Sequence, residues 1–552
     1  MKKYIILILA TLCFASCSDF LDKSPLDSPS SSDFPKSKEE LETATIGVYN
    51  SLYKRDGGHL QDELFWDNIT DLGYIRGGYE SSEGILTGSV NTRMFTTHWK
   101  HSYKGIQRAN FILENMDIAR SRINEVLCDR IESEVKFIRA YHYMHLTERF
   151  GDVPFLTTSI SISDSQLPRK PKDEIISHIL TDLENAANIL PEKYEGRDAG
   201  RVTKGAAYAL KARIALYNGE YEIARTAALN VMKLDYKLHP QYGDLFQLEG
   251  NNSKEIIFQL SYHKDVHYNN DHIFLGGRAG TGNWSTAVPS QMLIDSYLCT
   301  DGKPIDESPL YEQEKPFENR DPRLKQSIIV PQTWFGGDLF ETHPDSIQTY
   351  RIENGVSKRI GNLEVTNQYA TFTGYLWRKN WDETQYWKSW AQEGVMPLKI
   401  LRLGEVLLTY AEACIELNQI DATTYKAIND LRDRVNMPHI GTNLAQDTFR
   451  KIVRQERKIE LAGEGFRLYD IRRWQIAEHV IPGNMPGRKN KAYWYNPGIP
   501  TFDQFGHPHY SNQDQVFKTI QVRKFDKGRD YLWAIPQTER DLNPNLSQND
   551  GY

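Results

Sequence analysis

The sequence predicts a mainly α-helical protein, in which paired helices support an irregular, loop-rich half with a few short strands. Three observations predict this fold class. Apolar side chains recur at helical spacing over much of the chain, residues 201–234 read as two helices joined by a tight turn, and residues 251–380 lose the helical period. Because a single amphipathic pair cannot bury its own apolar faces, other helices should flank it.

The pair at residues 201–234 carries the clearest pattern. Thr203 is placed to cap the first helix, and Asn218-Gly219-Glu220 interrupts the apolar stripe before a second one begins. Alanines on the facing sides of the two helices would let their backbones approach closely. A small residue in the first helix, Gly-Glu-Tyr at the turn and Ala three residues later resemble a tetratricopeptide (TPR) hairpin, so we expect TPR-like helical hairpins.

Composition limits the possible partners and sites. With 39% hydrophobic and 25% charged residues, the chain of 552 residues is typical of a globular protein. The formal net charge of -7 does not favour nucleic acid as a partner. The 5 cysteines are scattered singly, which argues against a zinc site or a disulfide framework. We therefore expect no metal and no cofactor.

The N-terminus has the layout of an export signal. Two lysines precede an apolar run over residues 4–14, which Ala15-Ser16-Cys17 follows. A cysteine directly after small residues resembles a lipobox, in which residues 1–16 are the signal peptide and Cys17 becomes the lipidated N-terminus. Phe14 stands where such a motif usually has Leu. The alternative is an ordinary signal peptide that contains a cysteine.

The following segments define the expected organisation. Residues 17–37 are rich in Ser, Pro and Asp and read as a flexible tether, which would hold the folded body at a membrane surface. Residues 38–250 form an N-terminal helical part. Residues 251–552 form a C-terminal part with a loop-rich insertion and a further helical hairpin.

Hydrophobic periodicity places the other helices. The stretch 57–97 between the first two has no sustained period and reads as long loops, which are often binding elements. After residue 380, a second hairpin and a long, charge-rich helix follow. Expected helices, besides the pair at 201–234, cover 38–53, 98–116, 132–150, 171–190, 399–417, 424–435 and 449–473.

Seven stretches together resemble the SusD/RagB family of surface nutrient-binding lipoproteins. Examples are WKHSYKGIQRAN at 99–110 and RQERKIELAGEGFRLYDIRRW at 454–474. They occur in the family's order and extend over nearly the whole mature chain. The seven stretches are 99–110, 134–154, 289–301, 321–323, 402–413, 454–474 and 531–552.

The resemblance implies a SusD-like α-α superhelix of four TPR-like helix pairs with a loop-built half. It also implies a lipid anchor on the outer membrane, facing the cell exterior, and a partner TonB-dependent (SusC-like) transporter that the lipoprotein covers as a lid. The implied cargo is an oligosaccharide, or in some relatives a peptide. Ligand residues vary with the cargo in this family, so the resemblance assigns none.

A glycan site needs exposed aromatic rings for the apolar faces of sugars and polar side chains for their hydroxyls. Two groups of loops hold this mixture, one at residues 67–79 and one around the tryptophans of the insertion. For each residue, local burial in its loop is the alternative. The candidate ligand-binding residues are Asp71, Tyr74, Arg76, Asn283, Trp284 and Trp334. Trp99, Trp377 and Trp381 are expected in the core.

Other constellations have structural interpretations. Glu456, Glu460 and Glu464 lie four residues apart and could suggest glycoside cleavage. A salt-bridge network is favoured, because the same predicted helix carries Arg454, Arg457, Arg467, Arg472 and Arg473. The pairs His98/His101 and His142/His145 have spacing that could hold a metal, although helix packing is favoured. We therefore expect a binding protein without catalytic residues. The alternatives are a peptide- or protein-binding scaffold of the same type and a helical glycoside hydrolase.

Overall fold

The computed structural model describes residues 34–53, 64, 66–76, 93–160, 165–278, 282–382 and 394–552. Cys17, the signal segment and most of the tether lie outside the described residues. Within these ranges no helix combines the length and the apolar character that a membrane-spanning segment requires.

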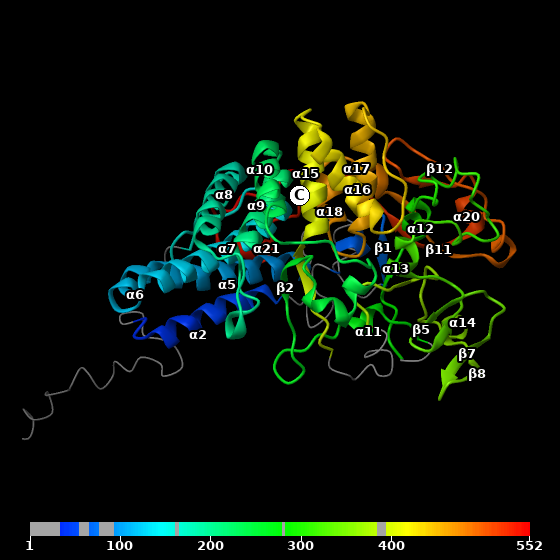
Figure 1. Ribbon diagram of the computed structural model, residues 1–552, viewed down its shortest axis with the longest axis horizontal. Coiled ribbons are helices and arrows are strands. Elements are labelled where there is room, and N and C mark those ends of the chain that lie inside the picture. Colours follow the sequence, from blue (N-terminus) through cyan, green and yellow to red (C-terminus); the bar gives the residue numbers. More distant parts are fainter. Residues whose placement is uncertain are drawn as a thin grey trace, which may run out of the picture.

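Helices form the left and centre of the molecule in Figure 1, and strands and loops gather on the right. The helices are α2 (Lys38–Tyr49), α5 (Arg93–Glu114), α6 (Met116–Arg122), α7 (Glu125–Phe150), α8 (Lys172–Ile189), α9 (Lys204–Tyr217), α10 (Tyr221–Met232), α11 (Asp271–Leu275), α12 (Gln291–Ser296), α13 (Arg323–Ser327), α14 (Leu363–Thr366), α15 (Leu403–Glu416), α16 (Ala422–Asp433), α17 (Gln446–Glu460), α18 (Arg467–Arg473), α19 (Ala477–Val480), α20 (Gln513–Val516) and α21 (Gln537–Leu542). Short 3₁₀ helices cover Asn50–Leu52, Trp66–Ile69, Gly196–Asp198, Asp244–Phe246, Leu248–Asn252 and Lys491–Tyr493.

The helical hairpin predicted at residues 201–234 is confirmed as α9 and α10. The Thr203 hydroxyl accepts a hydrogen bond from the amide of Ala206, which is the expected N-cap. Gly219 adopts a positive φ of 75° in the turn. Successive helices α7, α8, α9 and α10 pack against one another, and α10 continues the stack onto α15, which lies almost 200 residues later. The predicted fold class is confirmed.

Several helix boundaries differ from the expected ones. Helix α5 begins at Arg93, earlier than predicted, and α7 begins at Glu125, where the Asn124 side chain caps it. Residues 398–402, expected to begin a helix, instead form strand β10. The end of α7 at Gly151, with a φ of 71°, is as expected.

The single long helix predicted over 449–473 is wrong, because the chain turns between α17 and α18. Gly463 and Gly465 take φ values of 80° and 81°, which a continuing helix does not allow. The buried carboxylate of Asp67 accepts hydrogen bonds from four backbone amides of this turn, which are those of Gly463 (2.7 Å), Glu464 (3.2 Å), Gly465 (3.2 Å) and Arg467 (3.0 Å). A side chain some 400 residues away therefore satisfies the turn's backbone donors.

Among the described residues, the strands form one four-stranded sheet, β5-β6-β7-β8, and five two-stranded pairs. Two of these pairs, β1 with β3 and β2 with β10, are antiparallel and join segments far apart in the sequence. The strands are β1 (Gly73–Ile75), β2 (Ile256–Leu260), β3 (Ala287–Pro289), β4 (Ile328–Ile329), β5 (Thr333–Phe335), β6 (Asp338–Phe340), β7 (Gln348–Glu353), β8 (Val356–Gly361), β9 (Leu376–Trp377), β10 (Leu398–Arg402), β11 (Gly483–Lys489), β12 (Thr501–Phe502), β13 (Pro508–His509) and β14 (Phe517–Arg523).

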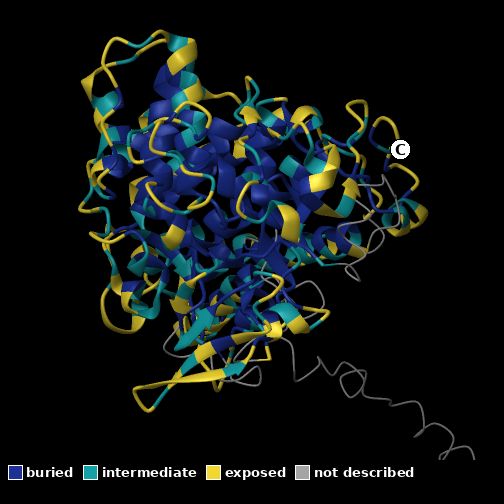
Figure 2. Ribbon diagram, turned by 90° about the vertical axis from the view of Figure 1, so that its right-hand side faces the viewer, coloured by how far each residue is buried: buried dark blue, intermediate teal, exposed yellow. Residues whose placement is uncertain are grey.

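Buried residues fill the interior of the molecule (Figure 2), and two hydrophobic cores hold most of them. The larger one runs from Phe34 to Leu546 and joins the helices of both halves. It contains Trp99 and Trp377, as predicted, while Trp381 lies in the second core. That second core lies beneath the loop-rich half and collects Tyr74, Val288, Phe335 and Leu376 from strands β1, β3, β5 and β9. These short strands therefore pack on one shared hydrophobic core.

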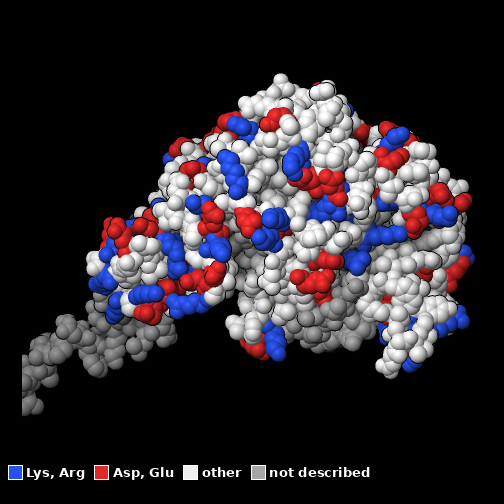
Figure 3. Space-filling model, in the orientation of Figure 1, with Lys and Arg blue, Asp and Glu red and all other residues white. Residues whose placement is uncertain are grey.

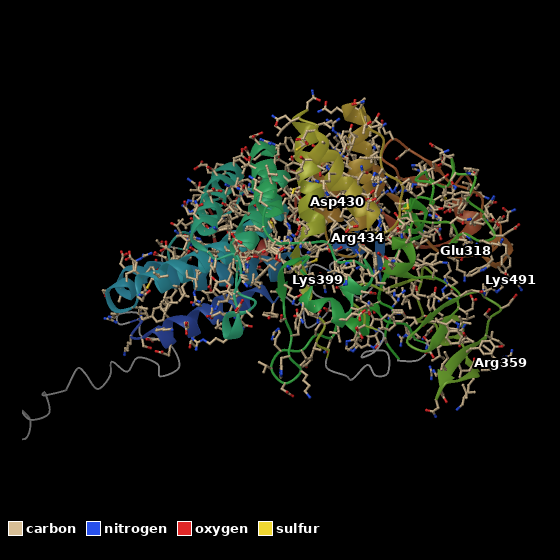
Figure 4. The ribbon with its side chains drawn as sticks, viewed as in Figure 1. Glu318, Arg359, Lys399, Asp430, Arg434 and Lys491 are labelled. Carbon is tan, nitrogen blue, oxygen red and sulfur yellow. The ribbon has the colours of Figure 1, made fainter. Side chains whose placement is uncertain are left out.

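The three glutamates of α17 and its C-terminal turn lie in a buried ion-pair network, so the salt-bridge interpretation is confirmed. The partners differ from those expected, because they come from other segments and not from arginines on the same helix. Glu460 pairs with Arg323 (3.1 Å), Arg402 (2.8 Å) and Arg434 (2.5 Å). Glu456 pairs with Arg323 and Arg432, and Glu464 with Lys379 and Arg402. Figure 4 shows Arg434 at the end of α16, above the label of Lys399 on β10.

A second buried carboxylate predicts how stability depends on pH. Burial raises the pKa of Glu412, but the facing Arg473 outweighs burial, and the pKa falls to about 2. Glu412 accepts hydrogen bonds from Arg473 (2.7 Å, twice) and from the indole of Trp474 (2.7 Å). Because the pKa is lowered in the folded state, the stabilisation is complete above the unfolded value and is lost as pH falls toward 2.

We expect the free energy of unfolding to decline by about 3 kcal/mol from this group between pH 4.5 and pH 2. Chemical denaturation of the wild-type protein and of Glu412→Gln at several pH values measures how much Glu412 contributes to the free energy of unfolding. The variant should be less stable at pH 7 and should lose less stability on acidification. Parallel pH profiles for the two proteins would contradict the assignment.

Candidate functional site

Strand β1 places Arg76 beside the loop that carries Trp284. β1 pairs with β3 in the register Tyr74 to Val288, and the amide of Arg76 continues the ladder by donating to the carbonyl of Thr286 at 2.8 Å. Trp284 precedes Thr286 by two residues, and its ring is 38% exposed. It packs edge-on against Phe274, with ring centroids 5.3 Å apart. Two distant sequence candidates therefore meet at one sheet edge.

An exposed tyrosine extends this edge. The ring of Tyr369 is 49% exposed, and the guanidinium groups of Arg76 and Arg278 lie 5.1 Å and 5.5 Å from its centre. Arg76 also donates to the carbonyl of Tyr369 at 2.5 Å. Such cation–π contacts orient both guanidinium groups. We call Arg76, Arg278, Trp284 and Tyr369 the Tyr369 surface.

The base of the Tyr369 surface is held by aromatic packing. Phe372 stacks on Tyr74 with ring centroids 6.0 Å apart and an interplanar angle of 18°. Arg76 lies 5.7 Å from the centre of the Phe372 ring, so the same guanidinium contacts both aromatic side chains of the segment. Tyr74 itself belongs to the second core. The surface is therefore mounted on packed strands, which reduces the entropy lost when a ligand binds.

Three of the sequence candidates are buried in this structure. Asn283 is fully buried, and Tyr74 is 6% exposed. The Asp71 carboxylate accepts hydrogen bonds from Arg467 at 2.9 Å and 2.8 Å. Burial raises the pKa of Asp71, but Arg467 outweighs it and the net shift is downward. Of the three, Tyr74 stacks on Phe372 at the base of the Tyr369 surface, and none is exposed.

Trp334 lies on a different hairpin. It is 45% exposed on β5, opposite Leu339 of β6, and its neighbour Phe335 enters the second core. Among the described residues, no ring contact links Trp334 with Trp284. The structure therefore brings Arg76 and Trp284 together and places Trp334 apart from them.

Sequence reasoning missed Arg278 and Tyr369. Arg278 follows Gly276-Gly277, and Tyr369 lies in an aperiodic stretch after α14. A basic residue in a glycine-rich loop and a tyrosine between Asn367 and Phe372 are the only local signals. What brings them to Arg76 is contact across more than 200 residues of sequence.

The visible face of the molecule carries acidic and basic side chains side by side (Figure 3). No extended field of one sign covers it. This pattern does not favour a polyanion or a polycation over the whole face. An arrangement of ring faces and guanidinium donors instead suits a polar, largely neutral ligand with apolar faces.

The buried glutamates are not arranged for glycoside cleavage. Such cleavage needs two carboxyl groups facing a bound sugar, one of them protonated. Despite burial, the arginine and lysine partners lower the pKa of Glu460 and of Glu464, and both carboxylates are bonded to those partners. Glu460 and Glu464 therefore stabilise the fold through buried ion pairs.

The histidine pairs contact protein groups. His142 and His101 approach the hydroxyl and the carbonyl of Ser51, at 2.8 Å and 2.7 Å, and His145 approaches the hydroxyl of Tyr469 at 3.2 Å. His98 packs between Trp66 and Trp533. Among the residues that the structure describes, no group of three or more His, Cys, Asp or Glu is arranged to hold a metal ion.

Two family models match the chain. The model described as "SusD family" matches residues 254–552, and the model described as "Starch-binding associating with outer membrane" matches residues 19–216. Together the two matches include both the helical back and the loop-rich half.

Comparisons with individual proteins point to the same family as the two family models. SusD-like protein P25 of Formosa agariphila is 28% identical over 517 residues, which cover 87% of this chain and 90% of the relative. Starch-binding protein SusD of Bacteroides thetaiotaomicron is 24% identical over 487 residues, covering 83% and 78%. The crystal structure of a SusD-like carbohydrate binding protein from Bacteroides fragilis superposes with a TM-score of 0.78 at 26% identity, covering 93% and 99%.

Proposed function

Because the chain belongs to the SusD family, we propose that it binds an oligosaccharide or polysaccharide at the Tyr369 surface and delivers it to a TonB-dependent transporter. The observation that carries the proposal is the exposed Tyr369, whose ring two guanidinium groups contact, together with the exposed Trp284 two residues before Thr286, to which the amide of Arg76 donates. The relatives named for binding starch and carbohydrate support the ligand class.

The chemistry of the surface fits a sugar. The C–H groups on one face of a pyranose pack against an aromatic ring, while its hydroxyls accept hydrogen bonds from N–H donors. Tyr369 and Trp284 supply the rings, and Arg76 and Arg278 supply the donors. Trp334 on β5 would extend the contact for a longer chain. Tyr74 supports the base of the surface through Phe372, whereas Asp71 and Asn283 are buried.

The site of action follows from the N-terminus and the family. Cys17 after Ala15-Ser16 would carry the lipid, and the tether would let the body reach a transporter in the outer membrane. A matching family model is described as associating with the outer membrane, which supports this location. In this proposal the chain captures cargo and carries out no chemistry on it.

The test is an affinity gel with a panel of soluble polysaccharides and the purified body. Trp284→Ala combined with Tyr369→Ala should weaken the binding of the retained polysaccharide by at least about 30-fold, because two stacking side chains contribute roughly 2 kcal/mol or more. Trp334→Ala, made separately, should cause a smaller loss. Tyr350→Ala on β7, which is 45% exposed, is the control and should bind normally.

Unchanged retention by the double variant would remove the Tyr369 surface from the proposal. Binding of peptides without any response to sugars would favour a peptide- or protein-binding scaffold. Release of reducing sugar from a retained polysaccharide would favour a hydrolase. The peptide-binding and reducing-sugar measurements use the same purified protein as the affinity gel.

A further inference from the structure

A cavity of about 640 Å³ opens on the other side of the segment that carries Tyr369. Tyr369 and Phe372 contact Arg76, whereas Thr373, Gly374 and Tyr375 line the cavity. Its remaining wall comes from residues 314–318, Lys325, residues 330–333 and 341–343, Ser346, and the end of β11 with the loop after it. We call it the Trp494 cavity. Its size suits one or two sugar rings.

Aromatic rings line part of the Trp494 cavity. His343 lies edge-on to Trp494, with ring centroids 4.9 Å apart, and 5.8 Å from Tyr495. Tyr495 is 62% exposed, although a tyrosine ring normally gains from burial. Trp494 is half-buried. Three rings from two loops therefore meet where a ligand could contact them.

Two cations in the cavity have no carboxylate partner among the described residues. Lys489 Nζ donates one long hydrogen bond, 3.4 Å, to the carbonyl of Trp494 and lies 5.4 Å from the centre of that ring. Arg488 donates to the carbonyls of Thr371 and Glu364, both at 2.6 Å. Burial lowers the pKa of Lys489 to about 8, although the charge of Asp295 acts in the opposite direction.

The carboxylates around the Trp494 cavity are engaged or lie at its rim. Glu341 accepts hydrogen bonds from the amides of Thr342 and His343 and from the side chain of Gln332. Glu318, labelled in Figure 4, pairs with Lys325 at 2.8 Å. Glu314 is exposed. Asp295, whose charge acts on Lys489, accepts hydrogen bonds from Gln291 (2.8 Å) and Tyr510 (2.9 Å). Among the described residues, neither Lys489 nor Arg488 forms a direct ion pair with a carboxylate.

We propose that the Trp494 cavity is a second carbohydrate site, which takes a sugar ring bearing a carboxylate or a sulfate ester. The anionic group pairs with Lys489 and Arg488, and the ring packs against Trp494 and Tyr495. The inference takes its ligand class from the proposed function but uses none of the residues of the Tyr369 surface. An ammonium paired with an anion at a partly buried site forms a strong, charge-assisted hydrogen bond.

Isothermal titration calorimetry tests the proposal with three oligosaccharides of equal length. One is an oligogalacturonate, one a sulfated galactose oligosaccharide and one a neutral glucose oligosaccharide. The wild-type protein should bind at least one anionic oligosaccharide more tightly than the neutral one. Lys489→Met should weaken that binding at least about 10-fold, and the exposed Tyr495→Ala should weaken it as well. Preference for one anionic probe distinguishes a carboxylate from a sulfate ligand.

Lys491→Met is the matched control. Lys491 lies two residues beyond Lys489, is labelled in Figure 4 and pairs with Asp345 at 2.8 Å, so its loss changes the net charge equally without touching the cavity. It should leave the affinity unchanged. Equal effects of the two methionine variants, or anionic probes that bind no better than the neutral one, would overturn the proposal.

The Trp284→Ala/Tyr369→Ala double variant separates the two sites. The anionic probe should bind it as it binds the wild type, even where polysaccharide retention is lost. If the double variant loses both anionic-probe binding and polysaccharide retention, all binding occurs at the Tyr369 surface and the second site is overturned. Loss of anionic binding in Lys489→Met alone, with the double variant binding every ligand normally, would instead uphold the second site and reject the first.

Discussion

Arg402→Met should lower the free energy of unfolding by about 3–5 kcal/mol, because it leaves buried carboxylates without their partner. Arg402 is 2% exposed and contacts Glu255 (2.8 Å), Glu460 (2.8 Å) and Glu464 (2.7 Å). Methionine keeps much of the volume but supplies no charge and no donor. Equilibrium denaturation of the mature chain measures the loss.

Lys426→Met is the control for Arg402→Met. Lys426 pairs with Asp430 at 2.6 Å on the surface of α16, but its side chain is 69% exposed. Figure 4 shows Asp430 on the same helix as Arg434. The control should change stability by less than about 1 kcal/mol, as exposed pairs do. Similar small losses in both variants would mean that the network contributes no more than a surface pair.

Asp67→Ala should cost at least about 3 kcal/mol, since it removes the acceptor of four buried amides at once. Those amides lie in the turn between α17 and α18, and the amide of Glu464 also donates to the carbonyl of Leu461 at 3.1 Å. Asp67→Asn should cost less, because its amide retains one acceptor oxygen. Thermal and chemical denaturation give both values.

The same Asp67 variant should also weaken glycan binding, because residue 67 anchors the segment that runs through β1 to Arg76. Asp306→Ala, an exposed aspartate, is the control for both measurements. Normal stability of Asp67→Ala would contradict the role of Asp67 in the turn. Normal binding with reduced stability would show that the Tyr369 surface does not depend on this anchor.

Local signals were sufficient to predict the helical back. The apolar period and Thr203 located α9 and α10 to within a few residues, because those helices depend on contacts with their neighbours in sequence. The turn inside 449–473 could not be predicted in this way. Its glycines read as tolerable in a helix until Asp67, from a different part of the chain, supplies the acceptor that stabilises the turn.

The candidate site could be predicted only in part for the same reason. Arg76 and Trp284 were identified by residue type and loop context, and β1–β3 pairing then brings their segments together. Asp71 carries the same polar signal as Arg76, but Arg467 buries it in an ion pair. The local signal of Tyr369 was only a tyrosine in an aperiodic stretch. Burial and exposure of loop side chains depend on tertiary neighbours that residue type does not reveal.

The pairing of β2 with β10 has a consequence for how such a protein diversifies. Leu260 lies opposite Leu398, so the two ends of the intervening 261–397 stretch leave the helical scaffold at one point. A long excursion whose ends are clamped together can gain or lose length at little entropic cost and without displacing α9 or α15. New ligand preferences could therefore arise by exchange of this excursion, while the surface formed by the helices stays the same.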